Sequence, residues 1–180
     1  MITINPKQES TKSLHHYLLS SIGPRPIALA STIDKNGCPN LSPFSYFNIF
    51  SSNPPILIFS PARRVRDNTT KDTLENAKQI KEVVINVVTY DIVDKMTLTS
   101  LDYEKDIDEF VKASFTHLKS DLIKPFRVKE SPIQFECKIN EIISLGKNGG
   151  AGNLIICEIL LIHIDQNILD KENNIDPKKV

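Results

Sequence analysis

The sequence lacks the features that mark several large classes of protein. Lysine plus arginine total 22, aspartate plus glutamate total 22, and the formal net charge is zero. This balance argues against broad electrostatic binding to nucleic acid or to an acidic membrane, because such binding needs a concentrated basic surface. No apolar run approaches the ~20 residues of a membrane-spanning helix. The N-terminus has no basic segment followed by an apolar core, so we expect no signal peptide.

Cysteines and histidines are few, and their spacing excludes further classes. The chain has three widely separated cysteines, Cys38, Cys137 and Cys157. We interpret them as reduced thiols in a cytoplasmic protein. None of the four histidines pairs with a cysteine at metal-ligand spacing, so we predict no metal site. His163 lies in an apolar run and is interpreted as a core histidine, with a role near the ligand as the alternative. The sequence also lacks a Gly-x-Ser-x-Gly elbow and a Walker loop.

Length and composition indicate one ordinary globular domain spanning residues 1–180. Hydrophobic residues make up 40% of the 180 residues and charged residues 24%. A chain of this size buries roughly 70% of its unfolded surface, which is enough for a proper core.

The order of the predicted elements indicates the fold class. Asn36-Gly37 is a hairpin signal, and Asp72 to Glu75 resembles a capping box with Asp72 as the cap. The many strands and few helical crossovers favour an antiparallel barrel over a doubly wound sheet. The predicted strands are residues 27–33, 56–59, 83–89, 133–145 and 154–164, and the predicted helices are residues 11–20, 91–101, 107–113 and one starting at 72.

The segment of residues 25–48 combines apolar side chains with neutral hydrogen-bonding groups. The first apolar run ends at Ser31 and Thr32, and Ser45, Tyr46 and Asn48 lie among prolines and phenylalanines. A mostly apolar site with a few placed polar groups suits a planar, polar heterocycle. The alternative is that these residues satisfy turns and strand ends. If the segment is extended, Tyr46 and its neighbour Phe47 point to opposite faces.

The second candidate site is the loop before the helix that begins near residue 72. Backbone N–H groups at a helix N-terminus attract anions. Arg63 or Arg64 is suited to bidentate phosphate binding, Lys71 supplies a point charge and Thr73 a hydroxyl. The alternative is a solvated surface loop. A third segment, residues 146–153, is rich in glycine. It is interpreted as a flexible hairpin turn or as a close backbone approach to a ligand.

The ordered set of motifs resembles the flavin reductase-like family of FMN-binding split-barrel proteins, which includes flavoredoxins. The matching pieces are Pro24-Arg25-Pro26-Ile27-Ala28 with Ser31-Thr32, Asn40-Leu41-Ser42-Pro43-Phe44-Ser45-Tyr46-Phe47-Asn48, Pro54-Pro55, Lys71-Asp72-Thr73-Leu74-Glu75-Asn76, Glu130-Ser131-Pro132 with Phe135-Glu136-Cys137, and Gly150-Ala151-Gly152-Asn153-Leu154. Each piece is modest, but they occur in family order across residues 24–165.

The resemblance implies a mainly β Greek-key split β-barrel with a few helices, and a homodimer with FMN near the subunit interface. The residues implied to contact the isoalloxazine and ribityl chain are Ser31, Thr32, Ser45, Tyr46, Phe47 and Asn48. The residues implied to hold the phosphate are Ser60, Arg63 or Arg64, Lys71 and Thr73. Family members commonly continue past the position of Val180, so by resemblance the chain is either naturally short or lacks a C-terminal segment.

These expectations combine into one leading function and two alternatives. The leading hypothesis is an oxidoreductase in which NADH or NADPH gives hydride to FMN, which passes electrons to an acceptor. No residue is assigned as a general acid or base. The first alternative is a non-catalytic FMN-binding electron carrier without a nicotinamide site. The second is a structural barrel that has lost its flavin. Neither a nucleic-acid partner nor a membrane is expected.

Overall fold

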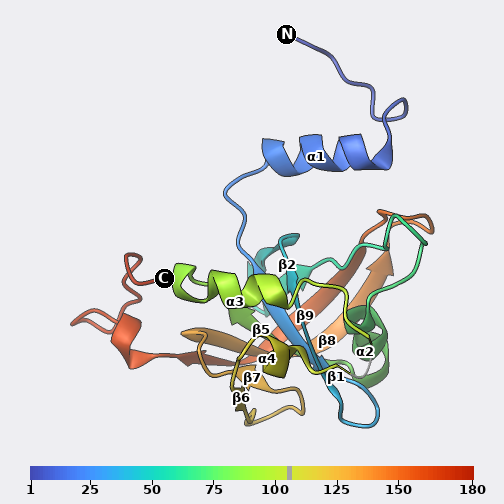
Figure 1. Ribbon diagram of the computed structural model, residues 1–180. Coiled ribbons are helices and arrows are strands. Elements are labelled where there is room, and N and C mark those ends of the chain that lie inside the picture. The colour runs from blue at the N-terminus through green and yellow to red at the C-terminus, as the bar shows by residue number, and fades with distance from the viewer. Residues whose placement is uncertain (105–106) are drawn as a thin grey trace.

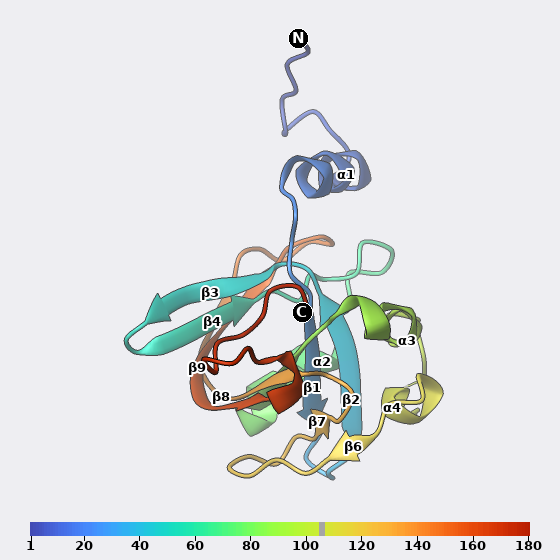
Figure 2. The same cartoon turned by 90° about the vertical axis from the view of Figure 1, so that its left-hand side faces the viewer.

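The computed structural model describes residues 1–104 and 107–180 and has a mainly β fold with a few helices (Figure 1). Its main sheet has the strand order β2-β1-β5-β8-β9-β4-β3, and every neighbouring pair is antiparallel. The predicted antiparallel arrangement is therefore confirmed. The strands of this sheet are β1 (Ala28–Ile33), β2 (Pro39–Phe44), β3 (Phe47–Ser52), β4 (Pro55–Phe59), β5 (Glu82–Val87), β8 (Ile133–Ser144) and β9 (Asn153–Ile164). Figure 2 shows that the sheet is strongly curved and that the β3–β4 hairpin projects from it.

The helices are short and lie around the sheet. They are α1 (Thr11–Ser21), α2 (Asp72–Ile80), α3 (Val93–Leu98) and α4 (Glu109–Lys112), with 3-10 turns at Tyr90–Ile92 and Gln166–Ile168. A small separate ladder pairs β6 (His117–Leu118) with β7 (Arg127–Val128). Helix α2 packs against β1 and β2, and α4 packs against β2. Among the described residues, no helix combines the length and apolarity needed to cross a membrane.

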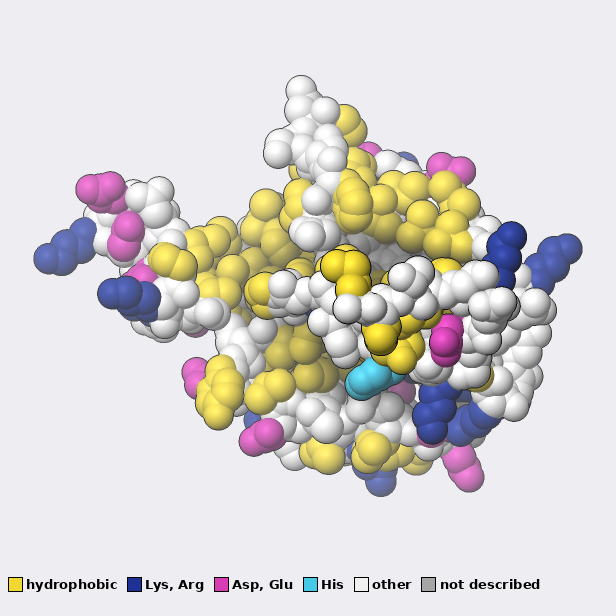
Figure 3. Space-filling view, turned by 90° about the horizontal axis from the view of Figure 1, so that it is seen from above, with side chains coloured by type: hydrophobic (Ala, Val, Ile, Leu, Met, Phe, Trp, Pro, Cys, Tyr) yellow, Lys and Arg dark blue, Asp and Glu magenta, His cyan; other side chains and the backbone are white. Residues whose placement is uncertain are grey.

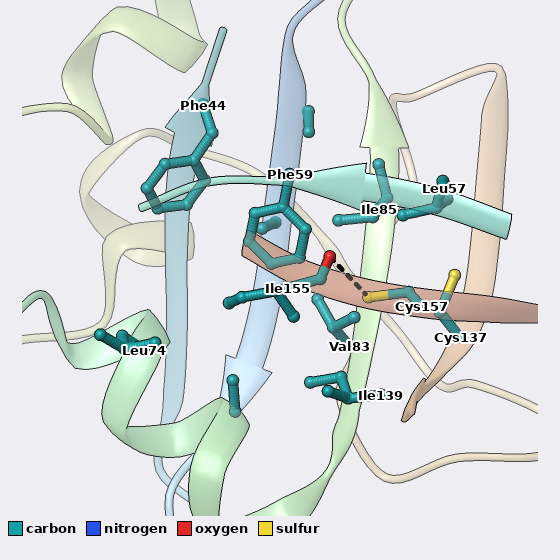
Figure 4. Packing of buried hydrophobic residues seen from close by; sticks show 13 residues of the cluster. Phe44, Leu57, Phe59, Leu74, Val83, Ile85, Cys137, Ile139, Ile155 and Cys157 are labelled. Carbon is teal, nitrogen blue, oxygen red and sulfur yellow. Dashed lines mark hydrogen bonds between the residues drawn. The ribbon is translucent and has the colours of Figure 1, made fainter. Parts of the chain in front are cut away.

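Two hydrophobic clusters form because side chains alternate across the strands. Ala28 and Ala30 of β1 pack into the larger cluster, while Leu29 between them packs into a second one, as the two-residue period of a strand requires. Figure 4 shows the larger cluster, in which Phe59 lies beside Phe44 with ring centroids 5.5 Å apart. This cluster fills the inside of the curved sheet and fixes the strands whose ends carry the candidate site.

Helix α1 is placed differently from the other helices. In both ribbon views it lies apart from the sheet and is joined to β1 by a single extended segment (Figures 1 and 2). Each of its residues is half-buried or exposed, including Tyr17, Leu18 and the adjoining Ile22. The helix at residues 11–20 was predicted correctly, but its sequence pattern gave no indication of where it would lie.

The structure corrects the prediction that Asp72 caps α2. Lys71 occupies the cap position, and Asp72 is already the first helical residue. The Lys71 carbonyl accepts the Leu74 N–H at 3.0 Å, but no side chain of Lys71 or Asp72 caps the helix. The observed helix begins one residue earlier than a cap at Asp72 requires, so Asp72 lies inside it. This start allows Thr73 and Leu74, in the first turn, to be buried.

Strand β3 and the bend before it were not predicted from the sequence. Ser45 and Tyr46 form a bend between β2 and β3 rather than part of one extended segment. The bend removes the expected alternation, so Tyr46 and Phe47 border the same hollow. Elsewhere the boundaries differ little, except that the helix predicted for residues 91–101 begins as a 3-10 turn and ends at Leu98.

Candidate functional site

The arginine loop, residues 60–71, joins β4 to α2 and is held in place by the glycine-rich turn, residues 146–152. Arg63 N–H donates to the Ala151 carbonyl, and Gly150 N–H donates to the Arg63 carbonyl, each at 2.9 Å. A Cβ on Gly149 would lie 2.9 Å from the Val65 Cα. The glycines therefore allow a close backbone approach, and the partner in this structure is the arginine loop.

The three arginines of the loop have different partners. The Nε of Arg63 donates to the Asn68 Oδ1 at 2.7 Å. Arg64 donates to the Thr70 carbonyl at 2.5 Å and lies 3.4 Å from the Asp102 carboxylate. Arg66 forms ion pairs with Asp67 and Asp102. Among the described residues, Arg63 is thus the one arginine of this loop without a carboxylate partner.

Lys71 is a partly desolvated cation at the end of the loop. Its side chain is half-buried, and Nζ lies 5.9 Å from the centroid of the Phe44 ring. Burial, followed by repulsion from Arg64, lowers the pKa of Lys71 below the ordinary lysine value. In the described part of the chain, no carboxylate oxygen lies within ion-pair distance of this ammonium. A desolvated cation without a paired anion is a favourable position for a bound anion.

A buried polar network lies behind Lys71. The Asn40 Nδ2 donates to the Thr73 Oγ1 at 2.9 Å, and the Asn76 Nδ2 donates to the Thr32 Oγ1 at 3.2 Å. Thr32 and Thr73 are both fully buried. No role was predicted for Asn40 or Asn76 from the sequence. Both residues belong to the matched family motifs, and this position could have pointed to them. The network fixes the first turn of α2 against β1 and β2.

Ser31 faces away from this network. It alternates with Thr32 along β1 and is fully buried on the side of the second hydrophobic cluster. Its Oγ hydrogen-bonds to no atom of residues 1–104 and 107–180. In this structure neither Ser31 nor Thr32 reaches a surface that a ligand can contact. The two hydroxyls that the sequence brings together are therefore separated by the pleat of the strand.

The predicted ring-binding segment borders a hollow of about 240 Å³ on the sheet. The predicted residues around it are Tyr46, Phe47, Asn48 and Ser60. Ser60 N–H donates to the Tyr46 carbonyl at 2.9 Å, which connects the bend to the arginine loop. Ser45 is half-buried in the same bend. This hollow has apolar walls from Phe50, Ile58 and Leu154.

A larger groove lies between α1 and the arginine loop, and we call it the α1 groove. Its volume is about 530 Å³, within the range of small-ligand sites. The groove is lined by Thr11, Lys12, Leu14, His15 and Leu18 of α1 and by Tyr46, Ala62, Arg63, Arg64, Val65, Arg66, Lys71 and Gly150 of the body. None of these lining residues is acidic. Tyr46 borders both the groove and the smaller hollow, so the two spaces adjoin.

A polar cleft lies beside Lys71. It is bordered by Ser42, Arg64, Lys71, Thr73 and Glu109, among other residues. The Glu109 carboxylate accepts the Leu41 N–H at 3.1 Å. Burial raises the pKa of this carboxyl. The structure thus gathers Arg63, Arg64, Lys71 and Thr73 around the start of α2, with Ser60 and the bend residues adjacent.

One acidic and histidine cluster lies elsewhere, between β8, β9 and the segment before β7. The potential ligand atoms of Asp121, Glu136 and His163 lie within 4.8 Å of one another. The buried Glu136 carboxylate already accepts the Asp121 and Leu122 N–H groups at 2.8 Å and contacts His163 Nε2 at 2.8 Å. Its oxygens are occupied, so we interpret this cluster as a structural network.

Comparison with known proteins agrees with this architecture. A sequence model of the flavin reductase like domain matches residues 20–175. An uncharacterized protein of Aquifex aeolicus (strain VF5) is 36% identical over 173 residues, covering 96% of this chain and 86% of that protein. Nitrilotriacetate monooxygenase component B from Bacillus cereus superposes with a TM-score of 0.92 at 30% identity, over 99% of this chain and 88% of the other.

A further solved structure bears on the fold. The split barrel domain protein from Shewanella frigidimarina NCIMB 400 superposes with a TM-score of 0.82 at 27% identity, covering 99% of this chain and 88% of that chain. The predicted mainly β split-barrel fold class is therefore confirmed. With the sheet order, the motifs and the match over residues 20–175 all in agreement, this chain belongs to the flavin reductase-like family.

Proposed function

We propose that this protein binds FMN and works as an oxidoreductase that passes hydride and electrons from NADH or NADPH to an acceptor. The observation that carries the proposal is the half-buried, unpaired Lys71 beside Arg63 and Arg64, next to a groove without acidic lining. Family membership supports flavin-based redox chemistry. The similar Bacillus cereus protein is a component of a monooxygenase, and a monooxygenase is an oxidoreductase. This similarity supports the proposed class of activity.

The residues present fit the two chemically different ends of FMN. The donor set at the start of α2 is cationic and suits a phosphate, with Arg63 and Arg64 offering planar guanidinium groups and Lys71 a point charge. The hydroxyls that the family resemblance assigns to the phosphate are those of Ser60 and Thr73, although Thr73 is fully buried and its Oγ1 accepts the Asn40 amide. Ser45 and Tyr46 of the bend, with Phe47 and Asn48 at the start of β3, offer apolar faces and neutral polar groups for the ring system. Bound FMN would supply hydride acceptance and electron transfer.

In this proposal the protein's side chains position FMN and tune its ring system, and they do not react themselves. In the proposal, the cations bind the phosphate and the aromatic side chains of the bend exclude water from the ring. Thr32 acts indirectly, because it supports Asn76 and Asn40 behind the cation cluster. His15 and Tyr46 share a hydrogen bond of 3.3 Å at the groove, and the proposal assigns neither of them as a general acid or base.

The dimer is also part of this proposal. The β3–β4 hairpin and the end of β9 expose large apolar side chains, including Phe50, Leu160 and Ile162. Contiguous exposed apolar surface commonly marks a protein interface. We therefore propose a homodimer formed through this face, which sedimentation analysis would test. The three free thiols fit the proposed cytoplasmic location.

The phosphate assignment is tested by comparing FMN with riboflavin. We expect the wild type to bind FMN much more tightly than riboflavin. Lys71→Ala removes a charged hydrogen-bond donor worth about 2 kcal/mol, so the dissociation constant for FMN should rise about 30-fold. The control is Lys35→Ala in the exposed β1–β2 turn. An unchanged FMN preference in Lys71→Ala and Arg63→Ala would contradict the assignment.

The nicotinamide step needs its own test. Reduced nicotinamide is added to the FMN-loaded protein without oxygen, and the visible flavin absorbance is followed. Bleaching by NADH or NADPH is expected. Retention of the oxidised spectrum would favour the alternative, a non-catalytic electron carrier, and a protein that binds no FMN would favour the structural barrel.

A further inference from the structure

Helix α1 contains little that would stabilise it alone. It has 11 residues, and isolated helices shorter than ~12–15 residues are marginal in water. Its ends are satisfied locally, because the Ser10 Oγ accepts the Ser13 N–H at 3.1 Å and Arg25 donates to the Ile22 carbonyl at 2.6 Å. These caps fix the ends of the helix but bury no apolar surface. A stable α1 therefore requires something to pack against.

Two close approaches join the side of α1 that faces the body to the rest of the described chain. Thr11, Leu14, His15 and Leu18 lie on one face, as their spacing of three and four residues dictates, and all four line the α1 groove. At one point the His15 Nδ1 and the Tyr46 hydroxyl share a hydrogen bond of 3.3 Å, with the rings edge to face. At the other, Thr11 lies so close to Gly150 that a Cβ there would be 2.5 Å from the threonine methyl.

Between these points the groove separates an apolar wall from a cationic one. Leu14 and Leu18 face it from α1, while Arg63 and Lys71 border it from the arginine loop. Seen from above, hydrophobic side chains cover much of this face of the molecule and basic side chains lie around its periphery (Figure 3). A molecule that satisfies both walls needs a flat apolar body and an anionic end, and its size must suit about 530 Å³.

We propose that α1 is a wall of the flavin site and that it sets how long FMN stays bound. This inference rests on the proposed FMN-binding function. Bound FMN would give Leu14 and Leu18 the apolar contact that the helix lacks, and α1 would in turn cover the ring. The family match begins at residue 20 and so leaves nearly all of α1 unassigned. Release of FMN then requires α1 to move away from Tyr46 and Gly150.

The first experiment measures FMN dissociation from the loaded protein by stopped-flow fluorescence. Leu14→Ala with Leu18→Ala removes most of the apolar wall, and the dissociation rate should rise about tenfold. The matched control is Ile22→Ala, which shortens an exposed aliphatic side chain at the end of the same helix but outside the groove. We expect this control to keep the wild-type rate.

The second experiment uses the unmodified protein and so does not depend on the variants folding. Amide hydrogen exchange of residues 11–21 is compared with and without FMN, and saturating FMN should slow it at least about tenfold. Unchanged exchange together with an unchanged dissociation rate in the leucine variant would overturn the role of α1 while leaving FMN binding intact. A wild type that binds no FMN would overturn both proposals, so the two failures are distinguishable.

Discussion

Two desolvated charges in different regions of this protein can be compared, Glu136 between β8 and β9 and Lys71 before α2. The Glu136 side chain is fully buried, yet it accepts the Asp121 and Leu122 N–H groups and the His163 ring nitrogen, each at 2.8 Å. Arg127 lies 3.8 Å away. Every part of this carboxylate has a partner from the protein itself.

Lys71 presents the opposite arrangement. It is only half-buried, but its ammonium faces the Phe44 ring and has no ion-pair partner in the described part of the chain. The pKa values show the same contrast. Burial lowers the pKa of Lys71, whereas at Glu136 the effect of burial is outweighed by the backbone and His163 hydrogen bonds, which hold its pKa below the ordinary value.

The difference separates a structural charge from one available to a ligand. A charge whose partners are all internal connects segments of the fold, and the Glu136 network holds residues 121–127 against β8 and β9. A charge that is desolvated and left unpaired costs stability unless a ligand supplies the partner. The comparison therefore predicts opposite consequences for substitutions in the two regions.

The largest expected effect is on stability and follows from removing Glu136. Glu136→Ala leaves His163 and two backbone N–H groups without their acceptor, and it removes the carboxylate that lies 3.8 Å from Arg127. Breaking a buried pair in this way costs about 3–5 kcal/mol. Urea denaturation would measure it, with Glu141→Ala on the exposed part of β8 as the control. A loss below about 1 kcal/mol would mean that the network contributes little.

An intermediate effect is expected at the contact between the glycine-rich turn and the arginine loop. A Cβ on Gly152 would lie 2.6 Å from the Ser60 Oγ, so Gly152→Ala should destabilise the protein by about 1–3 kcal/mol and weaken FMN binding. Adding Ser60→Ala removes the clashing oxygen. The double variant should recover part of the lost stability, and a double-mutant cycle on the free energy of unfolding would measure this recovery. If the stability effects of the two substitutions simply add, the close contact between residue 152 and Ser60 is contradicted.

The smallest expected effect tests whether the arginines that pair with Asp102 can be made available to bind FMN. Asp102 pairs with both Arg64 and Arg66. Among the carboxylates that the structure describes, Asp102→Asn should leave Arg64 without a partner and leave Arg66 with Asp67 alone. We expect FMN binding to tighten by about threefold, and by more at low salt because these charges are exposed to screening. Calorimetric titration at two salt concentrations would measure this change. Weaker binding by the variant would show that Asp102 positions the arginines rather than competing for them.

Much of the fold could be predicted from the sequence because local patterns were strong. The β-branched and apolar runs of β1, β5, β8 and β9 and the Asn36-Gly37 turn gave the antiparallel elements nearly in place. Strand β3 was missed because the bend at Ser45 and Tyr46 interrupts its pattern. The capping residue of α2 was wrong by one position, since two acidic residues three apart resemble a capping box whichever residue precedes the helix.

The candidate site was predictable as a set of residue types but not as a geometry. The sequence by itself determined the family, the barrel and the cations at the start of α2, because these depend on local pattern and on motif order. Only the tertiary structure decided that Ser31 and Thr32 face opposite sides, that Asp102 neutralises two of three arginines and that α1 borders the groove. Those outcomes depend on contacts between residues far apart in the chain, and no local pattern encodes which charges will meet or what a helix will pack against.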